Sequence, residues 1–364
     1  MDSDPFPGSE RSSGSEQLPR VRITRRRVIA SVVFVVSVVA FLYFGLPRLV
    51  GFGTEVKRLR DGDPWWLAVA ALLEVASFLG YIALFRAVFV HRTSRIGWRA
   101  SYEITMASLA ATRLFAAAGA GGIALTVWAL LRAGMERRLV AARMVAFMSL
   151  LYAVYMFTLV ICGLGLYTGL FPGRAPFAIT VVPAIMGASV IVLVLSIAVV
   201  PSDFDRLVGR WTGGAGRVAL VARRAAAVPA AAASGVRTAF DLIRSGDPGL
   251  LGAPAWWGFD IATLWACFHA FGASPPHAVI IMAYFVGWIA NTLPLPGGVG
   301  GVEGGLIGSF SAFGVNVQAA VLAVLAYRAF SFWLPTIPGA IAYLQLRRTV
   351  QRWRQEPVSA PAGG

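Results

Sequence analysis

The chain has 364 residues, of which 57% are hydrophobic and 13% are charged, and its mean hydropathy is +0.71. Soluble domains carry about 25% charged residues, so this composition excludes an ordinary soluble protein and indicates an all-α polytopic membrane protein. The net charge of +15 does not indicate nucleic-acid binding, because the basic residues are spread over the loops between apolar stretches.

The N-terminal segment, residues 1–27, is rich in Ser, Pro and Gly and has no apolar core, which predicts a disordered tail and not a cleavable signal. Three consecutive arginines, Arg25, Arg26 and Arg27, precede the first apolar stretch and should hold that end in the cytoplasm. The C-terminal tail, residues 347–364, contains four more arginines and is assigned to the same side.

Full spans need roughly 20 apolar residues, and six stretches qualify. They are residues 28–46, 65–90, 140–171, 177–200, 256–271 extended by its flanks, and 319–346. With the N-terminus inside, the cytoplasmic segments hold 23 basic residues and the outer segments 5, as the positive-inside rule predicts. The chain is therefore expected in the cell inner (plasma) membrane with both termini in the cytoplasm.

The first membrane half, residues 28–200, contains an apolar stretch at 101–131 that lies between two arginine-rich segments, both assigned to the cytoplasm. This stretch must enter and leave the membrane from the same side. Glycines in its middle permit a tight reversal of the chain, which predicts a re-entrant helical hairpin. Two complete spans would satisfy the same sidedness, so that alternative stays open.

The linker between the halves, residues 201–249, mixes arginines with small apolar residues. Such a pattern is typical of short amphipathic helices on the anionic leaflet. An ordinary helical connector in the cytoplasm would have the same composition, and both interpretations stay open.

The second half, residues 250–346, contains a stretch at 277–313 that must leave from and return to the outside. Its middle, "PLPGGVGG", breaks a helix at membrane depth, because Pro removes a backbone donor and Gly frees the backbone. Non-helical backbone at that depth is tolerated only inside protein or beside a wet cavity. The residues expected to break the helices of the two hairpins are Pro294, Pro296, Gly297, Gly298, Gly300, Gly301, Gly119, Gly121 and Gly122.

The two hairpin stretches also align with each other. A shift of 179 positions places Gly119 on Gly298, Gly121 on Gly300 and Gly122 on Gly301. Each stretch follows a span that has a Trp-Trp pair near its start and then one acid, Glu74 or Asp260. Because one hairpin enters from inside and the other from outside, the halves are predicted to be inverted-topology repeats, a pattern typical of transporters.

The segment "NTLPLPGGVGGVEGGLIGSFSAFGV", followed by "VLAYRAFSFWLPTIPGAIAYL", resembles the lysylphosphatidylglycerol synthase transmembrane family, also called flippase-like. The hallmark of that family is a proline-glycine segment leading to a glutamate, here Glu303, and then a Tyr-Arg pair, here Tyr327 and Arg328. Asp260 also fits the family pattern. Many members have an arginine directly before the glutamate, where this chain has Val302, and the first hairpin lacks prolines.

The resemblance implies lipid translocation between leaflets. In two-domain members, a soluble aminoacyl transferase domain follows the membrane region. Here the chain ends about 18 residues after the last predicted span, so aminoacyl transfer is not expected of it.

Ionisable residues within apolar stretches cost about 2.5 to 3.5 kcal/mol each at a helix centre, so they should face a cavity and pair. Arg86 and Arg143, near span ends, are expected to snorkel to the interface. Glu74 and Asp260 could instead be structural ties between helices. With Tyr327 added by the resemblance, the predicted substrate-binding or translocation site consists of Glu303, Arg328, Asp260, Arg113, Glu74 and Tyr327.

Catalytic and cofactor motifs are absent from the sequence. No Gly-Lys-Ser/Thr follows either glycine segment, no Gly-x-Ser-x-Gly occurs, and the three histidines have no metal-ligand spacing. Cys162 and Cys267 lie in apolar stretches and are expected to be buried packing thiols. No catalytic residue, metal or cofactor is therefore expected, although a membrane enzyme with Asp260 and Glu303 as acid and base stays open.

The function expected from these features is translocation of an anionic, aminoacylated or glycosylated lipid. The first alternative is a membrane-embedded enzyme or accessory subunit of glycolipid assembly, and the second is a small-solute carrier. Membrane lipids are the expected partners, and a protein partner would be a lipid-synthesising enzyme or a second copy of the chain. Uphill transport would need a proton or ion gradient, with Glu303 or Asp260 as the candidate carriers.

Overall fold

The computed structural model describes residues 59–90, 95–114, 120–199, 232–292 and 300–355. Within these ranges every regular element is a helix, and no strand occurs. The prediction of an all-α membrane protein is therefore confirmed. The first predicted span, the N-terminal tail, most of the linker and the Pro294–Gly298 part of the glycine segment lie outside the described residues.

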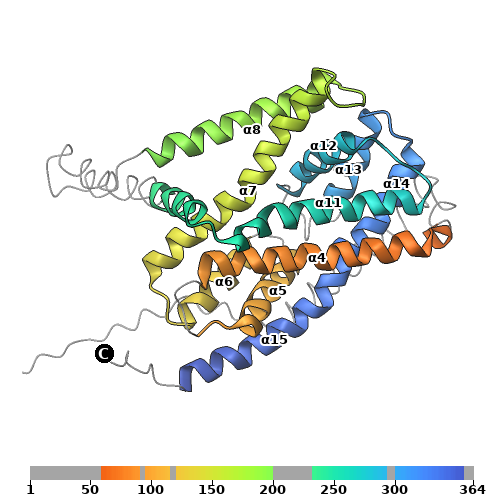
Figure 1. The fold of residues 1–364 in the computed structure, drawn as a ribbon. Coiled ribbons are helices and arrows are strands. Elements are labelled where there is room, and N and C mark those ends of the chain that lie inside the picture. The colour runs from red at the N-terminus through yellow and green to blue at the C-terminus, as the bar shows by residue number, and fades with distance from the viewer. Residues whose placement is uncertain (1–58, 91–94, 115–119, 200–231, 293–299, 356–364) are drawn as a thin grey trace, which may run out of the picture.

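The helices follow one another along the chain with short connections (Figure 1). In order, they are η3 (Leu59–Asp61), α4 (Pro64–Phe89), α5 (Trp98–Leu114), α6 (Ala120–Arg132), α7 (Arg137–Tyr167), α8 (Phe177–Ala198), a helix over 232–245, η4 (Pro248–Leu251), α11 (Gly252–Ala270), α12 (His277–Trp288), η5 (Ile289–Thr292), α13 (Gly301–Ala312), α14 (Val317–Arg328), the π-helical η7 (Ala329–Trp333) and α15 (Leu334–Gln355).

Four helices among the described residues are long and apolar enough to cross a membrane. They are α4, α7, α8 and the continuous rod formed by α14, η7 and α15, which runs from Val317 to Trp353. The 19-residue α11 is not among these four, although it was expected as a span. A multi-pass membrane location follows from these helices, whereas the count of six full spans stays a prediction.

Helices α4 and α11 form the central antiparallel pair of the molecule (Figure 1). Two glycines let the backbones approach closely: a Cβ on Gly80 would lie 2.9 Å from the Trp256 nitrogen, and one on Gly252 would lie 2.6 Å from the Leu84 nitrogen. Ser77 Oγ also donates to the Trp256 carbonyl at 2.8 Å. Small residues and hydroxyls hold helices together in this way in membranes, where the hydrophobic effect cannot.

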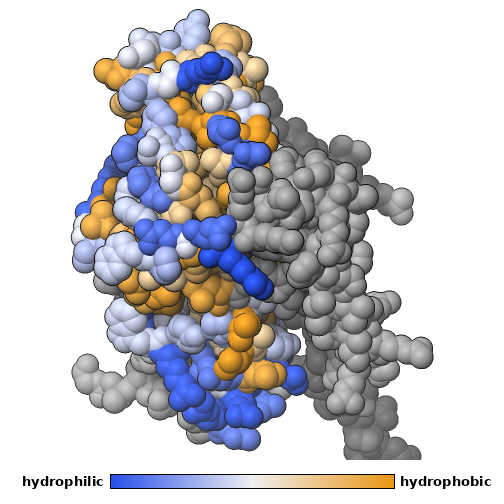
Figure 2. All heavy atoms as spheres, turned by 90° about the vertical axis from the view of Figure 1, so that its right-hand side faces the viewer, coloured by the Kyte–Doolittle hydropathy of each residue, from blue (hydrophilic) through white to orange (hydrophobic). Residues whose placement is uncertain are grey.

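The connections gather at two opposite ends of the helix bundle. At the end that we call the α12 end, the Asp63 amide donates to the Ala270 carbonyl at 2.9 Å, and Gly314 lies against the side chain of Arg174. Figure 2 views this end, where hydrophilic side chains are spread among hydrophobic ones. At the other end, the α5 end, Thr349 of α15 donates to Glu103 of α5 at 2.7 Å.

The two helical hairpins enter the bundle from these opposite ends. The α5–α6 hairpin begins and finishes at the α5 end, and the α12–α13 hairpin begins and finishes at the α12 end (Figure 1). Helices α12 and α13 have 12 residues each, which at 1.5 Å per residue is about 18 Å and less than the ~30 Å hydrocarbon core. This length favours the re-entrant alternative over two full spans for the second hairpin.

Each hairpin packs against the long helix of the other half of the chain. Helix α5 runs along α15, and α12 lies against α7. At the second contact, the hydroxyl of Tyr155 on α7 donates to the Phe285 carbonyl on α12, and the two rings stack with centroids 4.4 Å apart. The two halves of the chain are therefore packed together through both hairpins.

The described glycines of the hairpins have different roles. Gly121 and Gly122 lie in the first turn of α6, and a Cβ on Gly122 would lie 2.6 Å from the Ser108 carbonyl oxygen of α5. Gly122 therefore allows α5 and α6 to touch. Gly300, the N-cap of α13, has φ +85°, a left-handed conformation that favours glycine, and Gly301 begins the helix. Gly119 lies outside the described residues.

Candidate functional site

Charged residues from both halves of the chain line one cavity of about 280 Å³. Its walls come from α4, α5, α6, α7, α11, α12 and the segment from Arg328 to Phe332. Four residues of the predicted site line it directly, namely Glu74, Arg113, Asp260 and Arg328. The structure thus brings together side chains that are far apart in the sequence, and the other two predicted residues contact members of this set.

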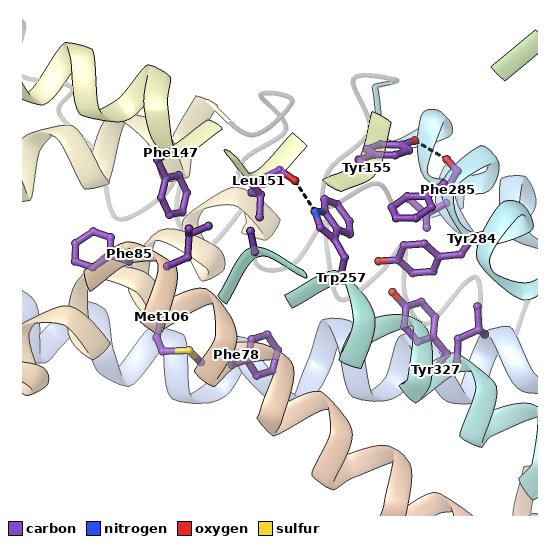
Figure 3. Packing of buried hydrophobic residues seen from close by; sticks show 14 of the residues in the cluster. Phe78, Phe85, Met106, Phe147, Leu151, Tyr155, Trp257, Tyr284, Phe285 and Tyr327 are labelled. Atoms are coloured by element: carbon purple, nitrogen blue, oxygen red, sulfur yellow. Dashed lines mark hydrogen bonds between the residues drawn. The ribbon is translucent and has the colours of Figure 1, made fainter. Parts of the chain in front are cut away.

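Asp260 of α11 is almost completely buried, with 4% of its surface exposed. Its Oδ2 accepts hydrogen bonds from the hydroxyls of Tyr327, at 2.9 Å, and Tyr284. Figure 3 shows these two tyrosines on different helices with their hydroxyls directed toward one another. Tyr284 was missed by sequence reasoning, although a phenol in an apolar helix is a signal, because a buried hydroxyl needs a partner.

Glu74 of α4 lies against the Asp260 carboxyl and the Thr263 hydroxyl of α11. It is 1% exposed, and its Oε2 has no hydrogen-bond partner among the described residues. Two carboxyl groups in contact at low dielectric cannot both carry a charge unless a cation balances them. The pair crosses the central α4–α11 contact and so joins the two halves of the chain.

Arg113, in the last turn of α5, faces this carboxyl pair and is attracted by both of its members. Its guanidinium carbon lies 5.8 Å from the ring centre of Phe78. The Nη1 atom of Arg113 is buried and has no hydrogen-bond partner among the described residues. A guanidinium group therefore lies within electrostatic reach of two acids while one of its nitrogens makes no hydrogen bond.

Glu303 and Arg328 form a separate ion pair, with Arg328 Nε 2.8 Å from Glu303 Oε1. The other oxygen of Glu303, Oε2, accepts from the Gly300 amide at 2.7 Å and so caps α13. Both oxygens of this glutamate are thus engaged in holding the start of α13 to α14. The geometry gives Glu303 a positioning role, and substrate or proton binding by it stays a prediction.

Four buried polar side-chain atoms in the described part of the chain lack a hydrogen-bond partner, and all four belong to residues that line this one cavity. They are Glu74 Oε2, Arg113 Nη1, Trp288 Nε1 and Ser331 Oγ. Each unsatisfied buried group costs about 1 to 3 kcal/mol, and native structures contain few of them. Their concentration here indicates a place where a polar ligand or water completes the hydrogen bonding.

The cavity continues as an apolar stripe along one face of α4. Glu74, Tyr81, Phe85 and Phe89 line it at helical spacing, so at 1.5 Å per residue the stripe extends about 22 Å from the acid. Aromatic, methionine and leucine side chains form the facing wall. Those from α7 and α11 are Met144, Phe147, Met148, Leu151, Tyr152, Trp256 and Trp257. The cavity is therefore charged at the Glu74 end, apolar along the α4, α7 and α11 walls, and lined by hydroxyl groups on the α5–α6 side.

Hydrogen bonds between helices join the walls of the cavity. Trp257 Nε1 donates to the Leu151 carbonyl at 2.8 Å, which ties α11 to α7 (Figure 3). On the hairpin side, the hydroxyls of Ser108 on α5 and Thr126 on α6 bond at 2.8 Å, and both residues line the cavity. The π-helical η7 supplies Ser331 and Phe332, and a π-helical turn inside an α-helical rod often marks a functional position.

The two arginines expected to snorkel differ from one another. Arg143 is 9% exposed and its Nη1 donates to the Phe89 carbonyl at 3.1 Å, so it satisfies the end of α4 instead of reaching solvent. Arg86 lies 3.8 Å from the Trp98 ring centre and donates to Ser101 Oγ at 3.1 Å. The snorkelling prediction is wrong for Arg143, because a helix terminus lies within its reach.

Metal ligation finds no support in the described part of the chain. No group of three or more His, Cys, Asp or Glu residues there could hold an ion. His269 and His277 pack on the Trp265 ring, with centroids 4.4 and 6.3 Å away. Cys162 and Cys267 are buried free thiols, as predicted.

The sequence matches the family described as "Lysylphosphatidylglycerol synthase TM region" over residues 28–339, which confirms the resemblance carried by the glycine segment and the Tyr-Arg pair. Two similar proteins of Methanothermobacter thermautotrophicus are both named "UPF0104 membrane protein". One is 39% identical over 87 residues, which is 24% of this chain and 25% of the relative. The other is 34% identical over 86 residues, or 23% and 26%. These matches cover about a quarter of each relative.

Proposed function

The chain belongs to the lysylphosphatidylglycerol synthase TM region family, and from that premise we propose that it translocates lipid between the leaflets of the cell inner membrane. The substrate class is a lipid with an anionic, aminoacylated or glycosylated headgroup. The observation that carries the proposal is the single cavity in which four unsatisfied polar atoms lie beside an apolar stripe. Lipids combine a polar headgroup with apolar chains in the same way.

In this arrangement, the headgroup binds at the level of Glu74, Asp260 and Arg113, where the unused donors and acceptors lie. Its acyl chains then pack along the stripe from Tyr81 to Phe89. The two hairpins reach this level from opposite ends of the bundle, so small movements of either hairpin would expose the headgroup to one side or the other. Alternating access around a central site is typical of inverted-repeat transporters.

The family match covers a membrane region only, and no catalytic domain is part of it. Aminoacyl transfer is therefore not proposed for this chain. The carboxyl groups at the cavity serve binding in this proposal and not bond cleavage. Covalent modification of a lipid by the purified chain would support the alternative, a membrane-embedded enzyme or accessory subunit of glycolipid assembly.

The test of this proposal is a translocation assay in liposomes that contain the purified full chain. Fluorescent phosphatidylglycerol, phosphatidylethanolamine and a glycolipid are each offered, and a membrane-impermeant quencher added outside then bleaches the accessible probe. We expect bleaching of inner-leaflet phosphatidylglycerol by the native chain and little by Arg113→Ala. Arg132→Ala, which removes an exposed arginine at the end of the same hairpin, is the matched control and should behave as the native chain does.

If no lipid becomes accessible beyond the level of empty liposomes, the translocation proposal fails. Mass spectra of the recovered lipids distinguish that result from chemistry, since the enzyme alternative requires a change in lipid mass.

The orientation is part of the same proposal, with the α5 end and both termini in the cytoplasm. Glu136→Cys at the α5 end should react with an impermeant thiol reagent only in inverted membranes, and Ser274→Cys at the α12 end only in intact cells. Both positions are exposed, and the native Cys162 and Cys267 are buried, which keeps the background low. Reaction of both variants from one side would contradict the arrangement of opposite hairpins.

A further inference from the structure

Three carboxyl groups, those of Glu74, Asp260 and Glu303, stand against two arginines, Arg113 and Arg328, at and beside the cavity. Arg328 is neutralised by Glu303, so the groups left to face a ligand are Glu74, Asp260 and Arg113. Two acids and one cation in a water-poor site favour a state in which one acid is protonated, because each uncompensated buried charge is costly.

Other titratable groups around the carboxyl pair do not change this balance. They are phenols and a thiol, which ordinarily stay neutral at neutral pH, and they come from four helices. Cys267 of α11, Tyr284 of α12 and Tyr327 of α14 lie around the acids, and Tyr81 of α4 lies near Arg113.

The two acids differ in their hydrogen bonds. Asp260 accepts two hydroxyl donors on one oxygen, and such bonds stabilise a negative charge. Glu74 lies against a single hydroxyl, that of Thr263, and its Oε2 receives no hydrogen bond. This difference favours a ligand-free state in which Asp260 carries the charge that balances Arg113 and Glu74 keeps the proton.

We propose that the site takes up one proton when an anionic headgroup binds to Arg113, so that proton and lipid occupy the cavity together. The inference rests on the translocation proposed above and names its coupling ion. The unused Nη1 donor of Arg113 binds the anion. The charge of Arg113 is then balanced by the headgroup, Asp260 loses its counter-ion, and a proton from the water phase neutralises it. The net charge of the site is the same before and after.

Proton uptake makes the affinity of the site for an anionic lipid depend on pH. Because binding takes up a proton, a fall in pH strengthens the binding of an anionic lipid and a rise weakens it. With one proton per lipid, the dissociation constant rises up to about tenfold per pH unit where the coupling is complete. A zwitterionic lipid without net charge should show no such dependence. A proton gradient across the membrane would then drive anionic lipid in the same direction as the proton.

Calorimetry on the purified full chain in detergent tests this directly. Dihexanoyl phosphatidylglycerol is titrated at one pH in two buffers of different ionisation enthalpy, and the difference in binding heat gives the number of protons taken up. We expect about one proton per bound lipid and none for dihexanoyl phosphatidylcholine. Binding of phosphatidylglycerol without proton uptake by the native chain would overturn the inference.

Variants of the two acids show which carboxyl group takes up the proton. Glu74→Gln, which resembles the protonated acid, should bind the lipid with the same proton uptake as the native chain. Asp260→Asn leaves Glu74 as the only carboxyl group facing Arg113, so Glu74 then takes up the proton, whereas the double variant Glu74→Gln with Asp260→Asn should bind the lipid without proton uptake. Glu103→Gln removes a buried carboxylate of α5 that bonds Arg99 and Thr349 outside the cavity, and this control should leave the proton count unchanged. Loss of proton uptake in Glu74→Gln contradicts the assignment of the proton to Asp260, and if that variant does not fold, the native proton count decides.

These experiments distinguish failure of the proton coupling from failure of the proposed translocation. Translocation of phosphatidylglycerol at a rate independent of pH, with no proton uptake, rejects the coupling and leaves translocation standing. Proton-linked binding without any translocation rejects the transport function and leaves the binding site standing. Absence of any binding by the probe rejects the inference.

Discussion

Two carboxyl sites of the molecule, one at Glu303 and one at Glu74, differ in how far their hydrogen bonds are satisfied. Both oxygens of Glu303 are engaged, at 2.8 Å by Arg328 and at 2.7 Å by the Gly300 amide. Glu74 has a buried oxygen with no partner in the described structure, beside a second acid. The first site ties two elements of one half together, and the second joins the two halves at a cavity.

The difference indicates that Glu303 contributes to the fold and that Glu74 has the features of a ligand-binding group. The glutamate that follows the glycine segment is the most recognisable acid in the sequence, yet its geometry is that of a structural tie. The less distinctive acid of α4 lies where hydrogen-bonding capacity is unused, which is where a ligand gains most from binding. Four predictions test the comparison, in order of their expected effect on stability.

The largest effect is expected for Glu303→Gln. The amide can still cap α13, but Arg328, 4% exposed, loses its counter-ion. Breaking a buried pair in this way costs about 3 to 5 kcal/mol, so the folded yield and the free energy of unfolding in denaturing detergent should both fall. If Glu303 instead binds substrate, as its place in the predicted site implies, Glu303→Gln should be abundant and folded but inactive. Normal stability with loss of transport would return Glu303 to the substrate site.

A smaller loss is expected for Tyr327→Phe, which removes one of the two hydroxyl donors to Asp260. A hydrogen bond to a charged group contributes about 1.5 to 3 kcal/mol. Tyr343→Phe, on α15 away from the cavity, serves as the control for removal of a hydroxyl. Equal effects of the two changes would show that Asp260 does not depend on the Tyr327 hydroxyl.

The hairpins themselves can be compared by adding one methyl group to each. Gly122→Ala places a Cβ against Ser108 and Thr112 and should cost about 1 to 3 kcal/mol by overpacking α5 against α6. Gly300→Ala strains a left-handed residue and should cost about 1 to 2 kcal/mol. Gly304→Ala, with open space around its Cβ position, is the control. Thermal unfolding of the three variants should rank them in that order.

The smallest effect on stability is expected for Glu74→Gln. It is the same change of glutamate to glutamine as Glu303→Gln, made at the other carboxyl site. Its Oε2 has no partner to lose, so the free energy of unfolding should change by less than about 1 kcal/mol. Denaturation of this variant and of Glu303→Gln under identical conditions is therefore the sharpest test of the comparison. A loss at Glu74 as large as at Glu303 would mean that the α4–α11 acid pair is itself a structural tie.

Much of the architecture could be predicted from the sequence, because it depends on local patterns. Apolar runs of fixed length predict membrane helices, and the composition predicts the all-α class. The break before Glu303 follows from the chemistry of proline and glycine, which act on their own backbone. The presence of acids and arginines inside apolar stretches likewise predicts a polar interior without reference to a fold.

Which of these groups pair was decided only by the tertiary structure. Pairing depends on distances between side chains on different helices, such as Glu74 and Asp260 or Tyr284 and Asp260, and sequence spacing carries no information on them. The same is true of Arg143, whose partner is a carbonyl at the end of another helix. Gly122 looks like a helix breaker in the sequence and is a packing contact in the fold, because a neighbouring helix occupies the space of its missing side chain.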